Sequence, residues 1–160
     1  MALLTTGSLA VLVTCLLWWT YFGWAREFME HAVVRLDAYG RVRVARDAYS
    51  LGHFPLICGV ISLAVGFENV LSHPAEPLSG PIALALWLGV ALFVGTTAGV
   101  MWRTTRLLLW PRLLIALCTG AALWIAVQQP PAMGLALTAL GLALIIVVER
   151  RLPANRARPE

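Results

Sequence analysis

The chain alternates between long apolar blocks and short polar connections. Five blocks are long enough to cross the hydrocarbon core of a bilayer, which takes about 20 residues of helix. They cover residues 3–24, 49–71, 81–102, 107–128 and 132–148. Backbone groups in lipid must bond within their own segment, and the blocks lack the alternating pattern of a membrane barrel. The pattern therefore predicts five spanning helices in an all-α bundle.

Composition places the chain in the same class. Of the 160 residues, 60% are hydrophobic and 12% are charged, whereas roughly a quarter of the residues of an ordinary globular domain are charged. So little polar surface cannot cover a soluble domain of this size. We therefore expect an integral, polytopic membrane protein with a single transmembrane domain over residues 1–149. No positive charge precedes the first block, which ends in aromatic residues, so it does not resemble a cleaved signal peptide.

The arginines indicate how the helices are oriented. All twelve positive charges are Arg, and they lie in the first and third connections, at the start of the fourth block and after the last block. The second connection and the short fourth one, "QQPP" at 128–131, contain none. The positive-inside rule then predicts an outer N-terminus and a cytoplasmic C-terminus in a bacterial inner membrane. This topology and anionic lipid headgroups explain the net charge of +4, so we expect no nucleic-acid partner.

Three features are expected at the cytoplasmic side. Residues 26–39 place apolar positions at helical spacing among charged ones, which predicts an amphipathic helix on the membrane surface or a continuation of the first helix. Residues 150–160 are basic and interrupted by Pro, which is typical of a disordered tail near headgroups. Arg112 lies in the first turn of the fourth helix, so we expect its side chain to extend to the inner interface, with a buried ion partner as the alternative.

The second block carries the candidate intramembrane polar site. His53 lies toward its inner end, just after Arg46 and Tyr49, and Glu68 lies toward its outer end. An ionisable residue inside a membrane segment is by default a candidate for a proton- or ion-responsive site. Fifteen residues of helix separate His53 from Glu68 by about 22 Å, so the two cannot share a direct hydrogen bond. Anchoring at the two interfaces is the alternative explanation.

The same block predicts close helix packing. Gly52, Gly59 and Gly66 recur every seven residues and form a small-residue stripe that lets another helix approach closely. The polar side chains point roughly the opposite way, so we expect this helix to be central in the bundle. Pro55 kinks the helix if it begins well upstream, which we favour, or occupies a first turn if it begins near His53.

An aromatic cluster closes the first block. Trp18, Tyr21 and Phe22 share a helix face, and Trp18 lies about 9 Å from Trp24 along the axis, too deep for an interfacial belt alone. We expect these three residues to pack within the protein, with a belt role as the alternative. The sequence offers no zinc-ligand cluster, nucleophile motif, phosphate loop or carboxylate pair. We therefore expect no metal, no cofactor and no enzymatic activity.

Two stretches of the chain resemble a known family. "LWWTYF" at 17–22 and "RDAYSLGHFPLICGVISLAVGFENVLSHP" at 46–74 are similar to the bacterial low-temperature-requirement A (LtrA) family. The shared pattern is an aromatic helix end, a basic connection, an R-x-x-Y-x-x-x-H-x-P-L-x-x-G run and an acidic residue before H-P. Its positions in this chain are Trp18, Trp19, Tyr21, Phe22, Arg46, Tyr49, His53, Pro55, Gly59, Glu68, His73 and Pro74. The later helices match in hydrophobic character and order alone.

The resemblance implies a non-enzymatic membrane protein with a role in transport or in adaptation to stress and low temperature. Members of the family are longer, and this chain resembles their C-terminal portion. The chain is then either a natural short protein or a fragment. The alternative function is that of a partial or assembly subunit, which needs a partner membrane half or a second copy of itself to be active.

Overall fold

The computed structural model describes residues 1–23, 37–46, 52–105 and 110–151, and within these ranges every regular element is a helix. The helices are α1 (Ala2–Phe22), α3 (Ala38–Arg46), α4 (His53–Ser72), α5 (Gly80–Thr105), α6 (Trp110–Ile125) and α7 (Pro131–Arg151). The all-α prediction is confirmed for this part of the chain. Most of the amphipathic segment expected at 26–39 lies outside the described residues.

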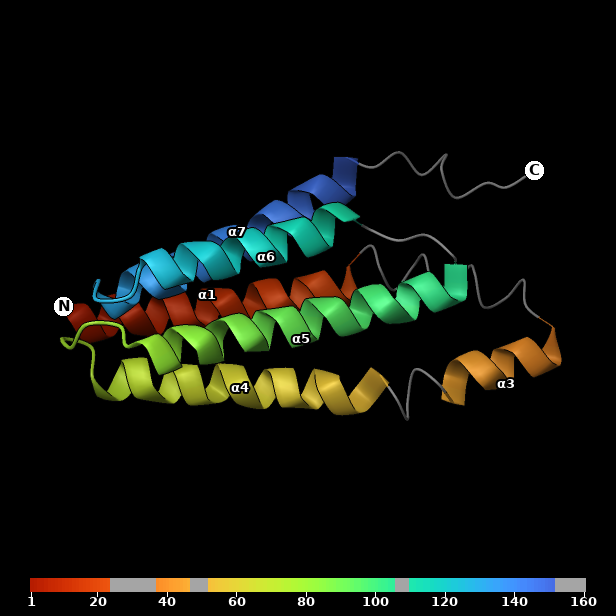
Figure 1. Ribbon diagram of the computed structural model, residues 1–160, viewed down its shortest axis with the longest axis horizontal. Coiled ribbons are helices and arrows are strands. Elements are labelled where there is room, and N and C mark those ends of the chain that lie inside the picture. The colour runs from red at the N-terminus through yellow and green to blue at the C-terminus, as the bar shows by residue number, and fades with distance from the viewer. Residues whose placement is uncertain (24–36, 47–51, 106–109, 152–160) are drawn as a thin grey trace.

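The long helices run side by side, and α3 lies beyond one end of the bundle (Figure 1). Four of them, α1, α4, α5 and α7, are long and apolar enough to cross a membrane. The block expected at 107–128 contains α6, an apolar helix of 16 residues. Four of the five expected spans thus correspond to helices of spanning length in the described residues.

Prolines mark where three of the helices begin. Pro81, Pro111 and Pro131 lie in the first turns of α5, α6 and α7, where the missing N–H costs little. Between α6 and α7, Gln128 adopts a φ of 73° that tightens the turn. Its backbone N–H donates to the carbonyl of Leu78 at 2.9 Å, and the N–H of Leu78 donates to the carbonyl of Gln129 at 2.8 Å. These two bonds join the α6–α7 turn to the α4–α5 connection.

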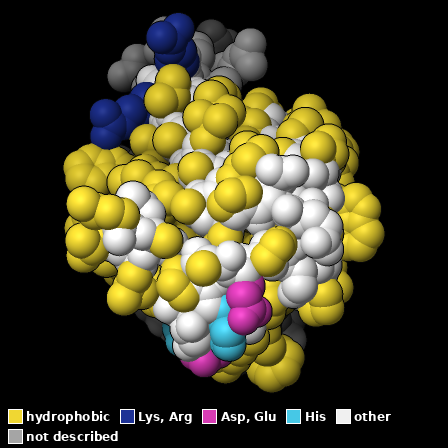
Figure 2. Space-filling model, turned by 90° about the vertical axis from the view of Figure 1, so that its left-hand side faces the viewer, with side chains coloured by type: hydrophobic (Ala, Val, Ile, Leu, Met, Phe, Trp, Pro, Cys, Tyr) yellow, Lys and Arg dark blue, Asp and Glu magenta, His cyan; other side chains and the backbone are white. Residues whose placement is uncertain are grey.

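Neighbouring helices pack mainly in sequence order. The helix α5 packs on α4 and α6, α6 packs on α7, and α7 packs on α1, whereas the contact between α1 and α4 is slight. Hydrophobic side chains cover much of the bundle end seen in Figure 2, while His and acidic side chains gather at one edge. Glu68, His73 and Glu76 are exposed there, where α4 ends. An apolar outer surface of this kind is suited to lipid.

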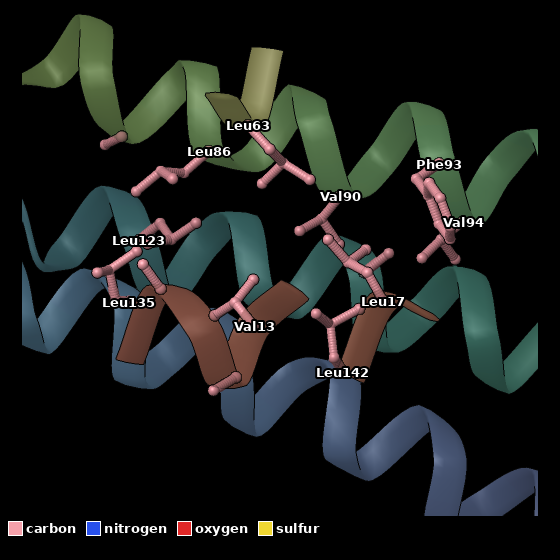
Figure 3. Packing of buried hydrophobic residues seen from close by; sticks show 14 of the residues in the cluster. Val13, Leu17, Leu63, Leu86, Val90, Phe93, Val94, Leu123, Leu135 and Leu142 are labelled. Atoms are coloured by element: carbon pink, nitrogen blue, oxygen red, sulfur yellow. The ribbon is translucent and has the colours of Figure 1, made fainter. Parts of the chain in front are cut away.

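The interior between the helices is also apolar, and its side chains interdigitate (Figure 3). The labelled core residues are Val13, Leu17, Leu63, Leu86, Val90, Phe93, Val94, Leu123, Leu135 and Leu142. They come from all five of the long helices, so a single core joins the bundle. A charged side chain in such an interior needs a partner there, because burying an isolated charge is very unfavourable.

The helix α4 lies at the edge of the bundle, so the prediction of a central helix is wrong. One side of α4 packs along α5, whereas its contact with α1 is slight. The opposite side is open, and Phe54 on that side is 73% exposed. Because α4 begins at His53, Pro55 lies in its first turn. The kinked alternative needed a helix that continues through residues 47–51, which lie outside the described residues.

Glycine brings α4 and α5 close together. A Cβ atom added to Gly59 would lie 3.0 Å from the carbonyl oxygen of Gly89 and 3.0 Å from the backbone nitrogen of Phe93. One added to Gly66 would lie 2.6 Å from a side-chain carbon of Leu86. Between these two sites the hydroxyl of Ser62 donates to the carbonyl of Ala85 at 2.8 Å. The small residues of α4 therefore lie where the two backbones approach.

Replacing Gly59 by Ala should destabilise the bundle, since the new methyl group meets backbone atoms that cannot turn aside. We expect a loss of about 1–3 kcal/mol, the usual cost of overpacking, measured by unfolding in mild detergent. Gly95→Ala is the matched control, because a Cβ there meets no described heavy atom within 4 Å. It should leave stability unchanged or raise it by up to about 1 kcal/mol through helix propensity. Equal effects of the two substitutions would contradict the close approach.

Candidate functional site

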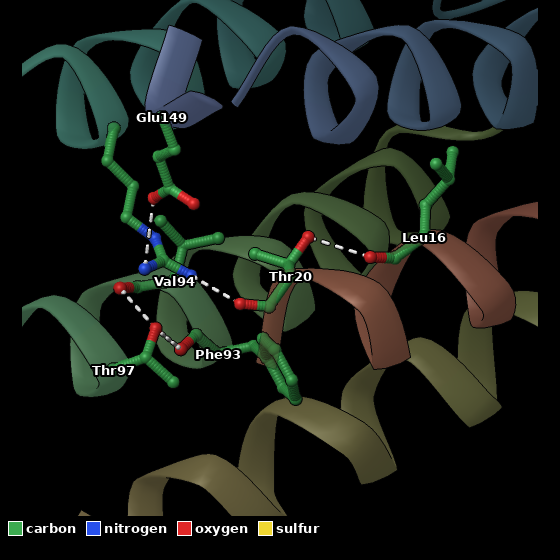
Figure 4. Close-up of polar contacts among 7 residues, drawn as sticks. Leu16, Thr20, Phe93, Val94, Thr97 and Glu149 are labelled. Atoms are coloured by element: carbon green, nitrogen blue, oxygen red, sulfur yellow. Dashed lines mark hydrogen bonds and ion pairs between the residues drawn. The ribbon is translucent and has the colours of Figure 1, made fainter. Parts of the chain in front are cut away.

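A buried ion pair joins the beginning of α6 to the end of α7. Arg112 is the third residue of α6 and Glu149 lies in the last turn of α7. Their side chains are 1% and 7% exposed, and Arg112 Nη1 lies 3.1 Å from Glu149 Oε1. Figure 4 shows the carboxylate directed into the bundle beside the guanidinium. The two helices are antiparallel, which places both charges at the same end of the molecule.

Each charge of this pair opposes the dipole of its own helix. A cation is unfavourable in the first turn of α6 and an anion is unfavourable in the last turn of α7, each by about 0.3–1 kcal/mol. Neither residue therefore stabilises the helix that carries it. The pairing accounts for both positions, because each charge neutralises the other inside an apolar core.

Arg112 also binds a third helix. Its Nη2 donates a hydrogen bond of 3.4 Å to the carbonyl oxygen of Thr20. Thr20 lies in the last turn of α1, where carbonyl groups run out of donors within the helix and carry the negative end of the dipole. The hydroxyl of Thr20 is occupied, since it donates to Leu16 at 2.7 Å. One guanidinium thus connects α1, α6 and α7.

The helix α5 also lines the described part of the site. Figure 4 shows Phe93, Val94 and Thr97 of α5 beside the pair. The Thr97 hydroxyl lies 3.0 Å from the carbonyl oxygens of both Phe93 and Val94, so it bonds to its own helix. These α5 side chains are therefore apolar or already hydrogen-bonded, and an apolar surrounding strengthens the attraction between the two charges.

Hydrogen bonding of the pair is incomplete. Nη1 of Arg112 and Oε1 of Glu149 are close, but they are not aligned as a hydrogen bond, and Nε of Arg112 has no acceptor among the described residues. Buried polar groups are rarely left in this state. A pair held mainly by charge, with few directional bonds, can be separated without breaking an extensive network.

The expectation that Arg112 extends to the interface is wrong, because Glu149 holds its side chain inside the bundle. A signal for this partner exists in the sequence. Arg112 and Glu149 lie at nearly equal sequence distances from the Gln129–Pro130 turn. In an antiparallel hairpin with a short turn, such residues lie side by side.

The residues predicted from the second block are spread out. His53 and Glu68 lie near opposite ends of α4 and both are exposed, so a direct contact between them does not occur. Glu68 accepts a hydrogen bond of 3.3 Å from the Ser72 hydroxyl. Arg46 ends α3 and is exposed, and Tyr49 lies outside the described residues. A functional role for these four residues stays a prediction.

The aromatic cluster of α1 divides between the core and the surface. Tyr21 packs on Phe93 of α5, with ring centres 6.1 Å apart. Trp18 and Phe22 stack on each other at 5.2 Å, yet they are 58% and 45% exposed. The expected packing within the protein therefore describes Tyr21, whereas Trp18 and Phe22 lie on the outer surface.

A second arginine reaches the same end of α1. The guanidinium carbon of Arg150 lies 5.4 Å from the ring centre of Trp19, a cation–π contact. Arg150 follows Glu149 directly, so the last turn of α7 contacts α1 through Arg150 and α6 through Glu149. In the described residues, no group of three or more His, Cys, Asp or Glu side chains is placed to hold a metal ion.

Comparison with known proteins extends the resemblance seen in the sequence. The family described as bacterial low temperature requirement A protein (LtrA) matches residues 1–147, so the match includes α5, α6 and most of α7. The chain is also 33% identical over 92 residues to an uncharacterized protein of Rhizobium meliloti (strain 1021). That alignment covers 57% of this chain and 21% of the relative, about a fifth of its length. No solved structure matches the chain.

Replacing Glu149 by Gln should strongly destabilise the bundle, because the charge of Arg112 loses its partner inside the apolar core. We expect a loss of about 3–5 kcal/mol in the free energy of unfolding, measured by denaturant titration in detergent. The matched control is Glu68→Gln on the exposed end of α4, which should change stability by less than about 0.5 kcal/mol.

A paired replacement tests the same interpretation from the other side. The variant Arg112→Met/Glu149→Leu removes both charges and fills similar volume, so its stability should lie near that of the natural chain. Equal losses from Glu149→Gln and Glu68→Gln would show that the pair is not buried in the bilayer-embedded protein.

Proposed function

The chain belongs to the bacterial low temperature requirement A family, and from this premise we propose that it is a non-enzymatic, multi-pass protein of the bacterial inner membrane that works as one part of a larger membrane assembly. The observation that carries the proposal is the apolar outer surface of the long helices. A surface of this kind is stable against lipid or against other membrane helices. The transport role implied by the resemblance stays a prediction.

We propose that α6 is the fifth span. Its 16 residues reach about 24 Å, somewhat less than the roughly 30 Å of a hydrocarbon core. Its packing between α5 and α7 supports the proposal. Its outward side chains support it as well, since Leu114, Leu117, Trp124 and Ile125 are all large, apolar and exposed. A short span is accommodated by thinning of the bilayer and by flanking residues.

The proposed topology places the N-terminus outside and the C-terminus in the cytoplasm. The ends of α5 and α7, the beginning of α6 and the helix α3 lie at one end of the bundle (Figure 1). The described arginines lie in these segments, whereas Glu68 and Glu76 lie at the other end. The positive-inside rule assigns the arginine-rich end to the cytoplasm, where it meets anionic headgroups.

An assembly role is supported by the loose contact between α1 and α4. The helices α1 and α7, which are far apart in the sequence, pack on each other and close the bundle. The helix α4 packs extensively on α5 alone among the described helices. Its open side carries Phe54, Ile57, Ile61 and Val65, all at least 45% exposed. The matched part of the Rhizobium relative is about a fifth of that protein. We infer that further helices, from a partner half or a second copy, cover this side.

Labelling of single cysteines tests the topology. After replacement of Cys15, Cys58 and Cys118 by Ala, we expect a cysteine at Glu76 to react with an impermeant maleimide in intact cells. A cysteine at Arg41 in α3 should react only after the membrane is permeabilised. Labelling of both positions from the same side would contradict an odd number of spans between them.

Native mass spectrometry from lipid nanodiscs or mild detergent tests the assembly. We expect a complex of defined stoichiometry, formed by copies of the chain or with a co-expressed partner half. A cysteine at Ile61 on the open side of α4 should cross-link in this complex. One at Leu140, which is 56% exposed on the outer side of α7, should not. A monomer that is stable alone would contradict the proposal.

A further inference from the structure

The helix α1 packs on α7 through one side, and its contact with α4 is slight. Its buried residues form one narrow stripe: Thr6, Ala10, Val13, Leu17 and Thr20. Its other sides are also mostly apolar, and large residues such as Leu4 and Val11 are exposed. Lipid tails are as apolar as Leu, so burial of this stripe gives little preference for the docked helix over a lipid-exposed one. Polar contacts therefore weigh heavily in the docking of α1.

Among the described residues, two polar contacts tie α1 to other helices, and both lie at its last turn. Arg112 of α6 donates to the carbonyl of Thr20, and Arg150 of α7 lies over the ring of Trp19. The hydroxyls of Thr6, Thr14 and Thr20 donate to carbonyls of α1 itself, so they do not tie it to a neighbour. Of the two, the hydrogen bond from Arg112 to Thr20 is the buried one, and it depends on the position of the Arg112 guanidinium.

That guanidinium is held inside by the charge of Glu149. Nε and Nη1 of Arg112 donate no hydrogen bond to a described residue, so the ion pair and the bond to Thr20 supply the identified polar contacts of the group. Arg112 lies in the first turn of α6, which brings the headgroup region within reach of a long arginine side chain. An uncompensated Arg112 would leave the interior by this short route.

We propose that Arg112 and Glu149 form a latch for α1. While Glu149 is charged, Arg112 stays between α6 and α7 and caps the carbonyl end of α1. When the charge of Glu149 is lost, Arg112 moves to the headgroup region, its bond to Thr20 breaks, and the last turn of α1 separates from the bundle. In this proposal the Arg112 side chain lies either inside the bundle or in the headgroup region, so the latch is a two-state element. The latch does not rest on the assembly proposed above.

Hydrogen–deuterium exchange of the full chain in nanodiscs locates the effect. In Glu149→Gln, amides at the last turn of α1, about residues 19–23, should exchange at least about tenfold faster, which corresponds to the loss of a charge-assisted hydrogen bond. Amides of α4 and α5 should be accelerated much less than those at the end of α1, and the control Glu68→Gln should match the natural chain throughout. Faster exchange confined to α6 and α7, with α1 protected, would show a simple staple of that hairpin and overturn the latch.

A chemical probe follows the guanidinium itself. An arginine-specific dicarbonyl reagent should modify Arg112 in Glu149→Gln and spare it in the natural chain, with Arg151 modified in both as the internal control. Protection of Arg112 in both proteins would overturn the proposed movement.

A variant that keeps its fold covers the case in which Glu149→Gln does not fold. Arg112→Met/Glu149→Leu leaves no unpaired charge, yet it removes the donor to Thr20. We expect the helix content of the natural chain, measured by circular dichroism, together with fast exchange at the end of α1. Full protection of that end in this variant would also overturn the latch.

Discussion

An arginine inside an apolar helix bundle must have its charge neutralised there, and this constraint shapes one end of the molecule. Arg112 and Glu149 are each placed against the dipole of their own helix, so the pair exists at the expense of α6 and α7 taken singly. The ion pair can form only when α6 and α7 run antiparallel in one register. The short turn before Pro131 supplies the direction, and the ion pair fixes the register.

Two kinds of contact then hold the bundle. On one side α4 and α5 approach closely because Gly59 and Gly89 leave room for backbone to meet backbone. On the other side α1, α6 and α7 meet at charged and polar groups around Arg112. Lipid supplies no hydrophobic drive between helices, so small residues and polar contacts have to supply the specificity. The loose contact between α1 and α4 lies between these two groups.

The sequence predicted the spans well and the covered faces poorly. Long apolar blocks located α1, α4, α5 and α7, and two short stretches indicated the family whose match covers residues 1–147. Hydrophobicity could not place α4, because a side that faces lipid and a side that faces protein are equally apolar. It also could not show that Trp18 faces outward. In a soluble helix bundle the sides that face water carry polar residues, so the sequence distinguishes them from the buried sides.

A buried partner for Arg112 was the less favoured alternative, and Glu149 was not identified as that partner. Arg112 lies at a helix end, where an arginine extending to the interface is the ordinary case, and Glu149 is followed by two arginines that suggest a cytoplasmic boundary. The decisive information was the position of both residues relative to the QQPP turn. Charged residues in membrane helices are best examined in pairs across a predicted hairpin, since each accounts for the other.

In the proposed latch, the same ion pair also controls whether the last turn of α1 stays packed on the bundle. Solid-state NMR on the chain in bilayers, with labelled Arg and Glu, tests the central contact most directly. A cross-peak between a guanidinium nitrogen of Arg112 and the carboxyl carbon of Glu149 is the expected result, with a weaker one to the carbonyl carbon of Thr20. Contacts of Arg112 with lipid phosphate and water alone would contradict it.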